Sequence, residues 1–296
     1  MRPAIDSQEA TNWAAFTASQ KSMSPESPDQ HLLNVLASSL VNVFAQGDFM
    51  ETKRYIKQLF VVRDFKEIFT NQKIMAVYAA EYCPGRALCY MRVFVSLDPI
   101  RELLSRGGSF YCLGSGNGSE LLAIAAAMHG NECQQVTVKL QDQSLYNVIP
   151  DIIAGVREGY SLDNDAMVVE NLVGDLTSSE YLESQIDSIA DASCVTAMFL
   201  LNEILADSKL AFVKLVTLLV KNMRKGALLL VVDSAGSFSE TSIGNQRYMS
   251  HVLLDKISAF DLVSAQDSEW YRHDSGLEYP LKLQNMRYFL RLYRKN

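Results

Sequence analysis

The chain has 296 residues, of which 48% are hydrophobic and 21% are charged, and its formal net charge is −7. This composition is that of a globular protein, and the negative charge argues against broad, sequence-independent binding to nucleic acid. No apolar run reaches the length of a membrane span, and the N-terminus is too polar for a secretory signal. The four histidines are scattered along the chain, which argues against a zinc site. We therefore expect an intracellular protein without a membrane segment and without a metal.

Residues 1–30 are rich in Ser, Gln, Ala, Asp and Pro and show no apolar period, which predicts a flexible arm. Over residues 31–106 the apolar residues recur at helical spacing, so an N-terminal helical region is expected, with helices at about 51–62 and 64–70. These two helices carry a cluster of basic residues: Lys53, Arg54, Lys57, Arg63 and Lys66. Such a cluster is more often a solvated face than a contact surface for RNA phosphates, and both readings stay open.

The pair Pro84-Gly85 is expected to break the chain, with a new helix over residues 86–97. Arg86 would then open an otherwise apolar helix. One alternative is a surface charge at a helix start, although cations are disfavoured there; the other is an arginine that points at a carboxylate.

A short apolar run, Phe110–Leu113, has the length of a strand and ends at Gly114, and two more glycines follow at Gly116 and Gly118. The next segment, residues 119–128, is rich in Ala and Leu and has high helix propensity. A strand, a glycine turn and a helix in this order let the backbone approach a ligand and present free N–H groups to it. The turn therefore predicts a nucleotide-like ligand.

Beyond this turn, apolar runs of strand length alternate with helical segments. The expected strands are 110–113, 136–140, 167–172, 194–201 and 227–232. This alternation predicts an α/β domain over residues 107–296 with a doubly wound, mostly parallel, Rossmann-like sheet. After a loop over 235–243 and a helix over 246–260, two runs at 262–270 and 286–293 have no helix between them and predict an antiparallel C-terminal pair. By analogy at the level of the fold alone, a sheet closed in this way points to S-adenosylmethionine (AdoMet) methyltransferases rather than dehydrogenases.

Polar residues stand at the carboxyl ends of the expected strands, where open parallel sheets bind their ligands. Asp142 follows the second strand, the usual place of an acid that accepts hydrogen bonds from ribose hydroxyls. After the third strand, Asp175 is expected to accept from the adenine amino group and Leu176 to pack on the ring. Each acid alone is most often a turn residue, but their convergence favours one nucleoside pocket. The main alternative for the glycine turn is a Rossmann dehydrogenase, whose fingerprint is G-x-G-x-x-G. That fingerprint would need a glycine at position 119, where this chain has Ser119, so the turn favours AdoMet over a dinucleotide.

Several motifs beyond the glycine turn are more specific. They are Pro84-Gly-Arg-Ala-Leu-Cys-Tyr90, Leu113-Gly-Ser-Gly-Asn-Gly-Ser-Glu120, Phe199-Leu-Leu-Asn-Glu203, Asp233-Ser-Ala-Gly236, Glu269-Trp-Tyr-Arg272 and Leu283-Gln-Asn-Met-Arg-Tyr288. With them the chain, from about residue 78 to residue 293, resembles the fungal large-subunit rRNA uridine-N3 methyltransferases. The resemblance implies AdoMet as cofactor and a uridine of 25S rRNA, free or in a pre-ribosomal particle, as substrate. It implies a ribosome-biogenesis enzyme of the nucleolus, nucleus or cytoplasm, expected to be a monomer.

The resemblance also implies roles for single residues. The cofactor-binding set is Arg86, Gly114, Ser115, Gly116, Gly118, Asp142, Asp175 and Leu176. Within it, Arg86 is expected to meet the methionine carboxylate of AdoMet. Asn202 and Glu203 match the motif beside the reactive methyl group.

Uridine N3 carries a proton and is a poor nucleophile until that proton leaves. Glu203 is therefore the expected base, and Asn202 is expected to donate a hydrogen bond to a uracil carbonyl. The alternative for Glu203 is a cap of the following helix. The uracil would have to be unstacked, and Trp270, Tyr271, Tyr248 or Phe238 could stack on it. Such aromatics are more often core residues, and for Trp270 we expect a place in the core.

Two other functions stay open at this point. The acidic charge favours an AdoMet-dependent methyltransferase of proteins or small molecules. A catalytically idle AdoMet-fold scaffold in ribosome assembly is the third possibility, against which the intact glycine turn and Asp142 argue.

Overall fold

The computed structural model of the chain describes residues 27–296, apart from residues 63, 130–132, 145, 237–240 and 244–245. Within this part, a seven-stranded sheet has the order β3-β2-β1-β4-β5-β9-β8. Its strands are β1 (Ser109–Leu113), β2 (Val136–Asp142), β3 (Met167–Val173), β4 (Cys194–Met198), β5 (Leu228–Ser234), β8 (Phe260–Tyr271) and β9 (Met286–Lys295).

The first five strands are parallel, β9 is antiparallel to β5, and β8 is antiparallel to β9. The predicted α/β class, with its antiparallel C-terminal pair, is therefore confirmed. The strand order reverses direction between β1 and β4, so the topological switch point of the sheet lies there.

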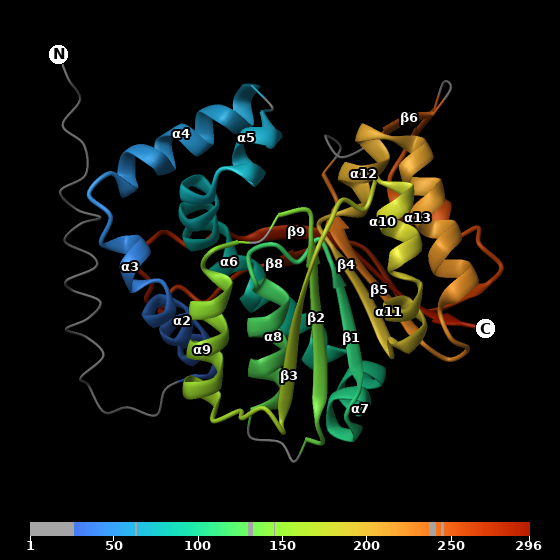
Figure 1. Cartoon of the computed structure of the whole chain (residues 1–296), viewed down its shortest axis with the longest axis horizontal. Coiled ribbons are helices and arrows are strands. Elements are labelled where there is room, and N and C mark those ends of the chain that lie inside the picture. The colour runs from blue at the N-terminus through green and yellow to red at the C-terminus, as the bar shows by residue number, and fades with distance from the viewer. Residues whose placement is uncertain (1–26, 63, 130–132, 145, 237–240, 244–245) are drawn as a thin grey trace.

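Helices cover both faces of the sheet (Figure 1). They are α2 (Pro28–Ser39), α3 (Val41–Phe44), α4 (Phe49–Val62), α5 (Phe65–Thr70), α6 (Gln72–Ser96), α7 (Asp98–Arg106), α8 (Ser119–Met128), α9 (Ile149–Tyr160), α10 (Ser179–Ser184), α11 (Ile186–Asp191), α12 (Leu201–Asp207), α13 (Lys209–Asn222) and α14 (Ser250–Leu254). Most of the predicted arm at residues 1–30 lies outside the described residues, and α2 already begins at Pro28. In the part of the chain that the structure describes, no helix has the length and apolarity of a membrane span.

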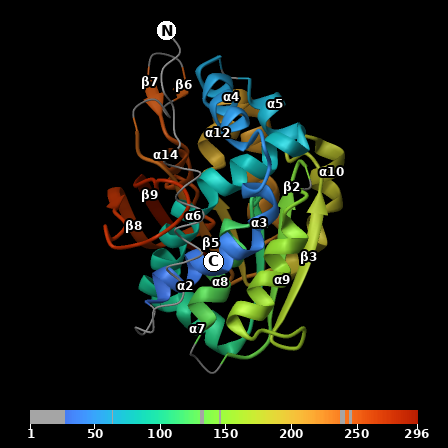
Figure 2. The ribbon, with the colours of Figure 1, turned by 90° about the vertical axis from the view of Figure 1, so that its left-hand side faces the viewer.

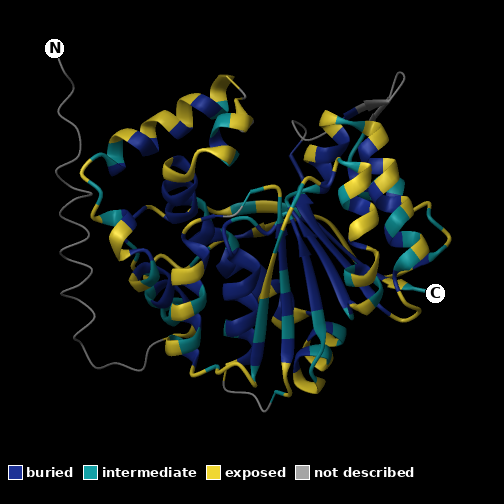
Figure 3. Cartoon of the chain, viewed as in Figure 1, coloured by how far each residue is buried: buried dark blue, intermediate teal, exposed yellow. Residues whose placement is uncertain are grey.

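The inner strands β1, β4 and β5 are buried on both faces (Figure 3), as expected for apolar strands sandwiched between helices, whereas the edge strands β3 and β8 are partly or largely exposed. Alternate residues of β1 illustrate this arrangement. Phe110 and Cys112 belong to a core that the sheet shares with α2, α6, α8 and α9. Tyr111 and Leu113 belong to a second core, shared with α12 and α13. The N-terminal helices therefore pack directly on the sheet and share its core.

The predicted break at Pro84-Gly85 is wrong, because α6 runs through both residues. A proline inside a helix frees the carbonyl four residues earlier, and here the hydroxyl of Tyr279 donates to that oxygen, Ala80 O, at 3.1 Å. A Cβ atom on Gly85 would lie 2.8 Å from the backbone oxygen of Gln284. The segment before β9 thus packs against α6 at the Pro-Gly pair, and Tyr279 replaces the helical hydrogen bond that Pro84 cannot donate.

Two further predictions differ from the structure. The fourth strand, expected to reach residue 201, ends at Met198. Instead of a long helix over 246–260, the chain forms strands β6 (Thr241–Ile243) and β7 (Gln246–Tyr248) and the short helix α14.

The backbone N–H and the hydroxyl of Ser250 both donate to Oδ1 of Asn202, at 3.0 and 2.9 Å. This long-range contact sets where α14 begins.

Candidate functional site

The glycine turn after β1 requires glycine at two positions. Gly114 and Gly118 have φ values of 63° and 79°, in the left-handed region that favours glycine. A Cβ on Gly114 would also lie 2.7 Å from Cδ1 of Leu200. Gly118 is the N-cap of α8, so the turn leads directly into the helix.

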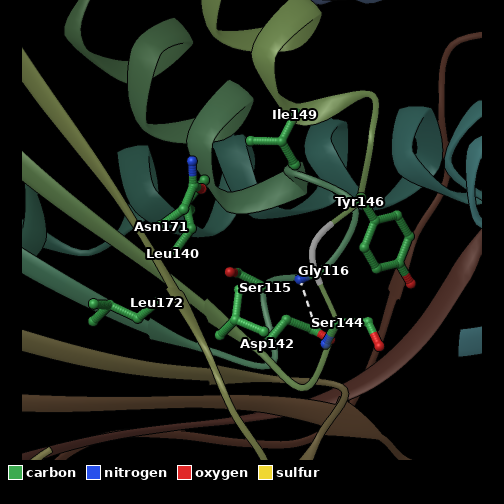
Figure 4. A pocket seen from close by; sticks show the side chains of 10 residues that line it. Ser115, Gly116, Leu140, Asp142, Ser144, Tyr146, Ile149, Asn171 and Leu172 are labelled. Atoms are coloured by element: carbon green, nitrogen blue, oxygen red, sulfur yellow. Dashed lines mark hydrogen bonds between the residues drawn. The ribbon is translucent and has the colours of Figure 1, made fainter. Parts of the chain in front are cut away.

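The turn is bonded to the end of the next strand. The N–H of Gly116 donates to Oδ2 of Asp142 at 2.8 Å, and the N–H of Ser144 donates to Oδ1 at 3.2 Å (Figure 4). Burial raises the pKa of Asp142 to about 6, although these backbone donors act in the opposite direction. The structure thus brings two predicted site residues, Gly116 and Asp142, into direct contact.

Gln141, which has no role in the sequence-based prediction, joins three strand ends. Its Oε1 accepts from the N–H of Gly114 at 3.3 Å, and its Nε2 donates to Gly174 O at 2.7 Å. Its backbone oxygen accepts from the N–H of Ser115 at 2.9 Å. The side chain is fully buried. A glutamine in a strand that must be buried on both faces is the sequence signal that could have revealed it.

A pocket of about 230 Å³, including its open mouth, lies beside this turn. Its lining residues are Ser115, Gly116, Leu140, Asp142, Ser144, Tyr146, Ile149, Asn171, Leu172 and Val173. It combines an acid, backbone donors and apolar walls, the chemistry that a ribose and an adenine require.

Asp175 and Leu176, predicted to hold the adenine, do not line this pocket. Oδ1 of Asp175 accepts from the N–H and the hydroxyl of Thr177, both at 2.7 Å. Leu176 is buried in the second core. At the end of β3, Leu172 and Val173 instead face the pocket, and the roles given to Asp175 and Leu176 stay predictions.

Arg86 lies in the middle of α6 rather than at a helix start. Its guanidinium carbon is 5.6 Å from the ring centre of Tyr78 and 5.6 Å from that of Phe199. Burial acts to lower the pKa of Arg86, but Tyr78, Tyr90 and Glu203 raise it, and the net shift is upward. Among the described residues, no carboxylate forms an ion pair with it. A cation held between two rings and facing no ion-pair partner is suited to an anionic ligand group.

Phe199 joins β4 to α12 in an unusual conformation. Its φ of 56° is rare for a bulky residue, and strain of this kind concentrates at functional sites. Its N–H donates to Val232 O at 2.7 Å, which fixes the turn to β5. The sequence-based prediction gave no role to this aromatic residue.

Asn202 and Glu203 follow on the first turn of α12. Asn202 is buried, and its side chain donates to Ser234 O at 3.2 Å while its Oδ1 accepts from Ser250. Glu203 is exposed to solvent, but desolvation by surrounding protein atoms raises its pKa to about 7, and the nearby Asp233 acts in the same direction. Asn202 therefore holds the turn, whereas Glu203 carries a carboxyl group that can exchange protons near neutral pH.

The aromatic residues expected to stack on a base lie in different settings. Trp270 is 55% exposed on β8, where the guanidinium of Arg272 lies 5.7 Å from its ring centre, so its expected place in the core is wrong. Tyr271 is part of the first core. Tyr248 ends β7, and Phe238 lies outside the described residues.

These residues fit AdoMet by their chemistry. Asp142 and the turn N–H groups suit a nucleoside, and Arg86 suits the carboxylate of an amino acid. A Cβ on Gly116 would lie 2.7 Å from Oδ2 of Asp142 and 2.9 Å from Tyr146, so only a glycine lets the turn approach these two side chains this closely. In the described part of the chain, no group of three or more His, Cys, Asp or Glu side chains could hold a metal ion.

The sheet and this site define a nucleoside-binding enzyme of the Rossmann-like methyltransferase type. Residues 36–294 match the family described as putative SAM-dependent methyltransferase, and the chain belongs to that family. Its cofactor is AdoMet, and it is a methyltransferase.

Known proteins similar to this chain include one with a described RNA activity. The chain is 26% identical over 273 residues to the 25S rRNA (uridine(2843)-N(3))-methyltransferase of Saccharomyces cerevisiae, covering 79% of this chain and 74% of the yeast protein. Similar solved structures include an O-methyltransferase family protein from Burkholderia thailandensis, with a TM-score of 0.46, 12% identity and coverage of 84% and 72% of the two chains. A SAM-dependent methyltransferase from Methanosarcina mazei has a TM-score of 0.42, 10% identity and coverage of 67% and 97%.

Proposed function

We propose that this protein methylates N3 of a uridine in the RNA of the large ribosomal subunit. The observation that carries the proposal is the position of Glu203, a carboxyl group with a pKa of about 7 on the turn after β4, at the same end of the sheet as Gly116 and Asp142. The similarity to the yeast uridine-N3 methyltransferase supports this substrate class. Ribosome biogenesis would place the protein in the nucleolus, the nucleus or the cytoplasm.

Methylation at N3 needs a group that accepts the N3 proton. When bound, AdoMet supplies the electrophilic methyl group. Glu203 takes the proton from N3, and because its side chain is open to solvent, it can release that proton to water. Its pKa of about 7 leaves about half of it ionised at neutral pH and keeps it a stronger base than an ordinary carboxylate.

The neighbouring residues position the base and the uracil. Asn202 fixes the first turn of α12 through Ser234 and Ser250, so Glu203 projects from a rigid support. A hydrogen bond from the amide of Asn202 to a uracil carbonyl would compete with the bonds of that amide to Ser234 and Asp233. Phe199 is the aromatic side chain that we place against the uracil, four residues before Glu203.

A basic surface on α4 and α5 would contact the RNA backbone. Figures 1 and 2 show these helices at the end of the molecule where α12 and β6 also lie. Arg54 and Lys57 are exposed on α4, and Lys66 is exposed on α5. Lys53, predicted with them, is instead buried at 6% exposure, with its Nζ 3.3 Å from Oε2 of Glu81. We call Arg54, Lys57 and Lys66 the α4–α5 basic surface.

The test is a methylation assay with labelled AdoMet on three substrates: protein-free large-subunit rRNA, pre-ribosomal particles and soluble protein extract. We expect label in RNA, recovered as 3-methyluridine after digestion to nucleosides. Label in protein or small molecules would support the other class of methyltransferase. AdoMet binding without transfer to any of the three would support the idle scaffold.

A further inference from the structure

Glu120 is a buried acid beside the cofactor site for which the proposed reaction has no use. It lies in the first turn of α8, two residues after Gly118, and is 3% exposed. The rest of that helix, after Ser119, is apolar. Its Oε1 has no hydrogen-bond partner among the described residues. A buried acceptor without a donor costs free energy, so a carboxyl group kept in this state calls for an explanation.

The surroundings of Glu120 include the face of α6 that carries Arg86. Cys83, Arg86 and Tyr90 follow one another at intervals of three and four residues, so they share one face of α6, and α6 packs against α8. Glu120 acts electrostatically on Cys83 and Tyr90, and Arg86 acts on Glu120. The acid and the arginine therefore lie near each other at the glycine turn.

Arg86 does not neutralise this acid. No ion pair joins the two side chains in the described part of the chain, and Arg86 lies between the rings of Tyr78 and Phe199 instead. Burial raises the pKa of Glu120 to about 8, and Arg86 offsets this only in part. The site thus holds a cation and an acid that each lack a charged partner.

The amino-acid end of AdoMet carries the complementary pair of charges, an α-carboxylate and an α-ammonium group. We propose that Glu120 accepts hydrogen bonds from the α-ammonium group while Arg86 binds the α-carboxylate. The ammonium has three N–H donors, which would satisfy the free oxygen of Glu120 and favour its ionised form. This inference rests on the AdoMet site of the proposed function, but not on the RNA substrate.

A purely structural role for Glu120 predicts something different. An acid in the first turn of a helix is favourable because of the helix dipole, but that effect needs neither burial nor an unsatisfied oxygen. If Glu120 had only a structural role, its replacement would change the affinity for every ligand that binds at the turn to the same extent. If Glu120 binds the ammonium group, its replacement lowers the affinity only for ligands that carry this group.

The test is calorimetric binding of three ligands to the wild-type chain, to Glu120→Gln and to the exposed control Glu183→Gln. The ligands are S-adenosylhomocysteine, its analogue with hydrogen in place of the α-ammonium group, and 5′-methylthioadenosine, which lacks the amino-acid end. We expect Glu120→Gln to weaken S-adenosylhomocysteine binding by about 10- to 100-fold and the other two by less than about threefold. Glu183→Gln should change none of them.

The outcomes separate this inference from the cofactor site itself. If Glu120→Gln weakens all three ligands equally, or none, the role in ammonium binding is overturned while AdoMet binding by the wild type stands. If the wild type binds none of the ligands, the cofactor site fails and the inference fails with it. Should Glu120→Gln not fold, the wild type still tests the inference, because equal affinities for S-adenosylhomocysteine and for the analogue without the ammonium group would overturn it.

Discussion

The backbone N–H of Gly116 and the carboxylate of Asp142 are 26 residues apart in the sequence and 2.8 Å apart in the structure. This bond joins the turn after β1 to the end of β2 and forms one wall of the pocket that we propose for the nucleoside. Since Gln141 and Ser115 bond the same two segments, the wall is held at several points.

Gly116→Ala should weaken AdoMet binding by about tenfold or more, the cost of losing a hydrogen bond to a charged group. The added Cβ would lie 2.7 Å from Oδ2 of Asp142 and 2.9 Å from Tyr146, so the carboxylate must move. Gly47→Ala is the matched control, because a Cβ there meets nothing within 4 Å. Calorimetry of both variants checks this, and equal affinities would show that the wall does not bind the nucleoside.

Glu203→Gln should lower the rate of methyl transfer by about 10²- to 10⁴-fold, the usual loss for a general base, with AdoMet affinity nearly unchanged. The base must be ionised to act, so the wild-type kcat should rise with pH through about 7 and then level off. Single-turnover rates between pH 5.5 and 9 test both points. A variant with wild-type rates would leave Glu203 with the role of a helix-cap residue.

Unfolding of the ligand-free protein should depend on pH in a defined direction. Folding raises the pKa of Asp142 and Asp233 to about 6 and that of Glu120 to about 8, mainly through burial, so the folded chain keeps protons that the unfolded chain has lost. The free energy of unfolding therefore receives a contribution that is complete below about pH 4 and is lost as the pH rises to about 8. His251, whose pKa is lowered by burial, acts in the opposite direction.

Comparison of the wild type with Glu120→Gln isolates one of these groups. Urea denaturation at pH 6 and pH 8 should show a smaller decrease in the variant, because it lacks the acid that loses its proton in this interval. The same slope in both proteins would mean that Glu120 is already ionised in the folded chain at pH 6.

Arg54→Gln together with Lys57→Gln should weaken rRNA binding and flatten its salt dependence. Each lost phosphate contact should lower the slope of log affinity against log salt by about 0.7 to 0.9. Lys221→Gln with Lys225→Gln, two exposed lysines that flank the end of α13, is the control with the same change in charge. Binding titrations at several salt concentrations measure the effect. If the first pair behaves like the control pair, the α4–α5 basic surface is only solvated.

Local patterns in the chain were enough to predict the glycine turn and the alternation of strands and helices over residues 109–234. Apolar runs of strand length and the left-handed positions of Gly114 and Gly118 are local features, and local features persist when the chain folds. The meeting of Gly116 with Asp142 was also predictable, because the carboxyl ends of parallel neighbours lie at one edge of a sheet.

Contacts between segments far apart in the chain override the local rules at three places. Pro84 stays inside α6 because Tyr279, far along the chain, bonds the carbonyl that the proline leaves free. Lys53 leaves the basic surface because Glu81 pairs with it inside the core. Glu120 is an ordinary helix acid in the sequence, and only the packing of α8 against α6 buries it beside Arg86. Burial and long-range contacts decide these three outcomes, and no local pattern in the sequence encodes them.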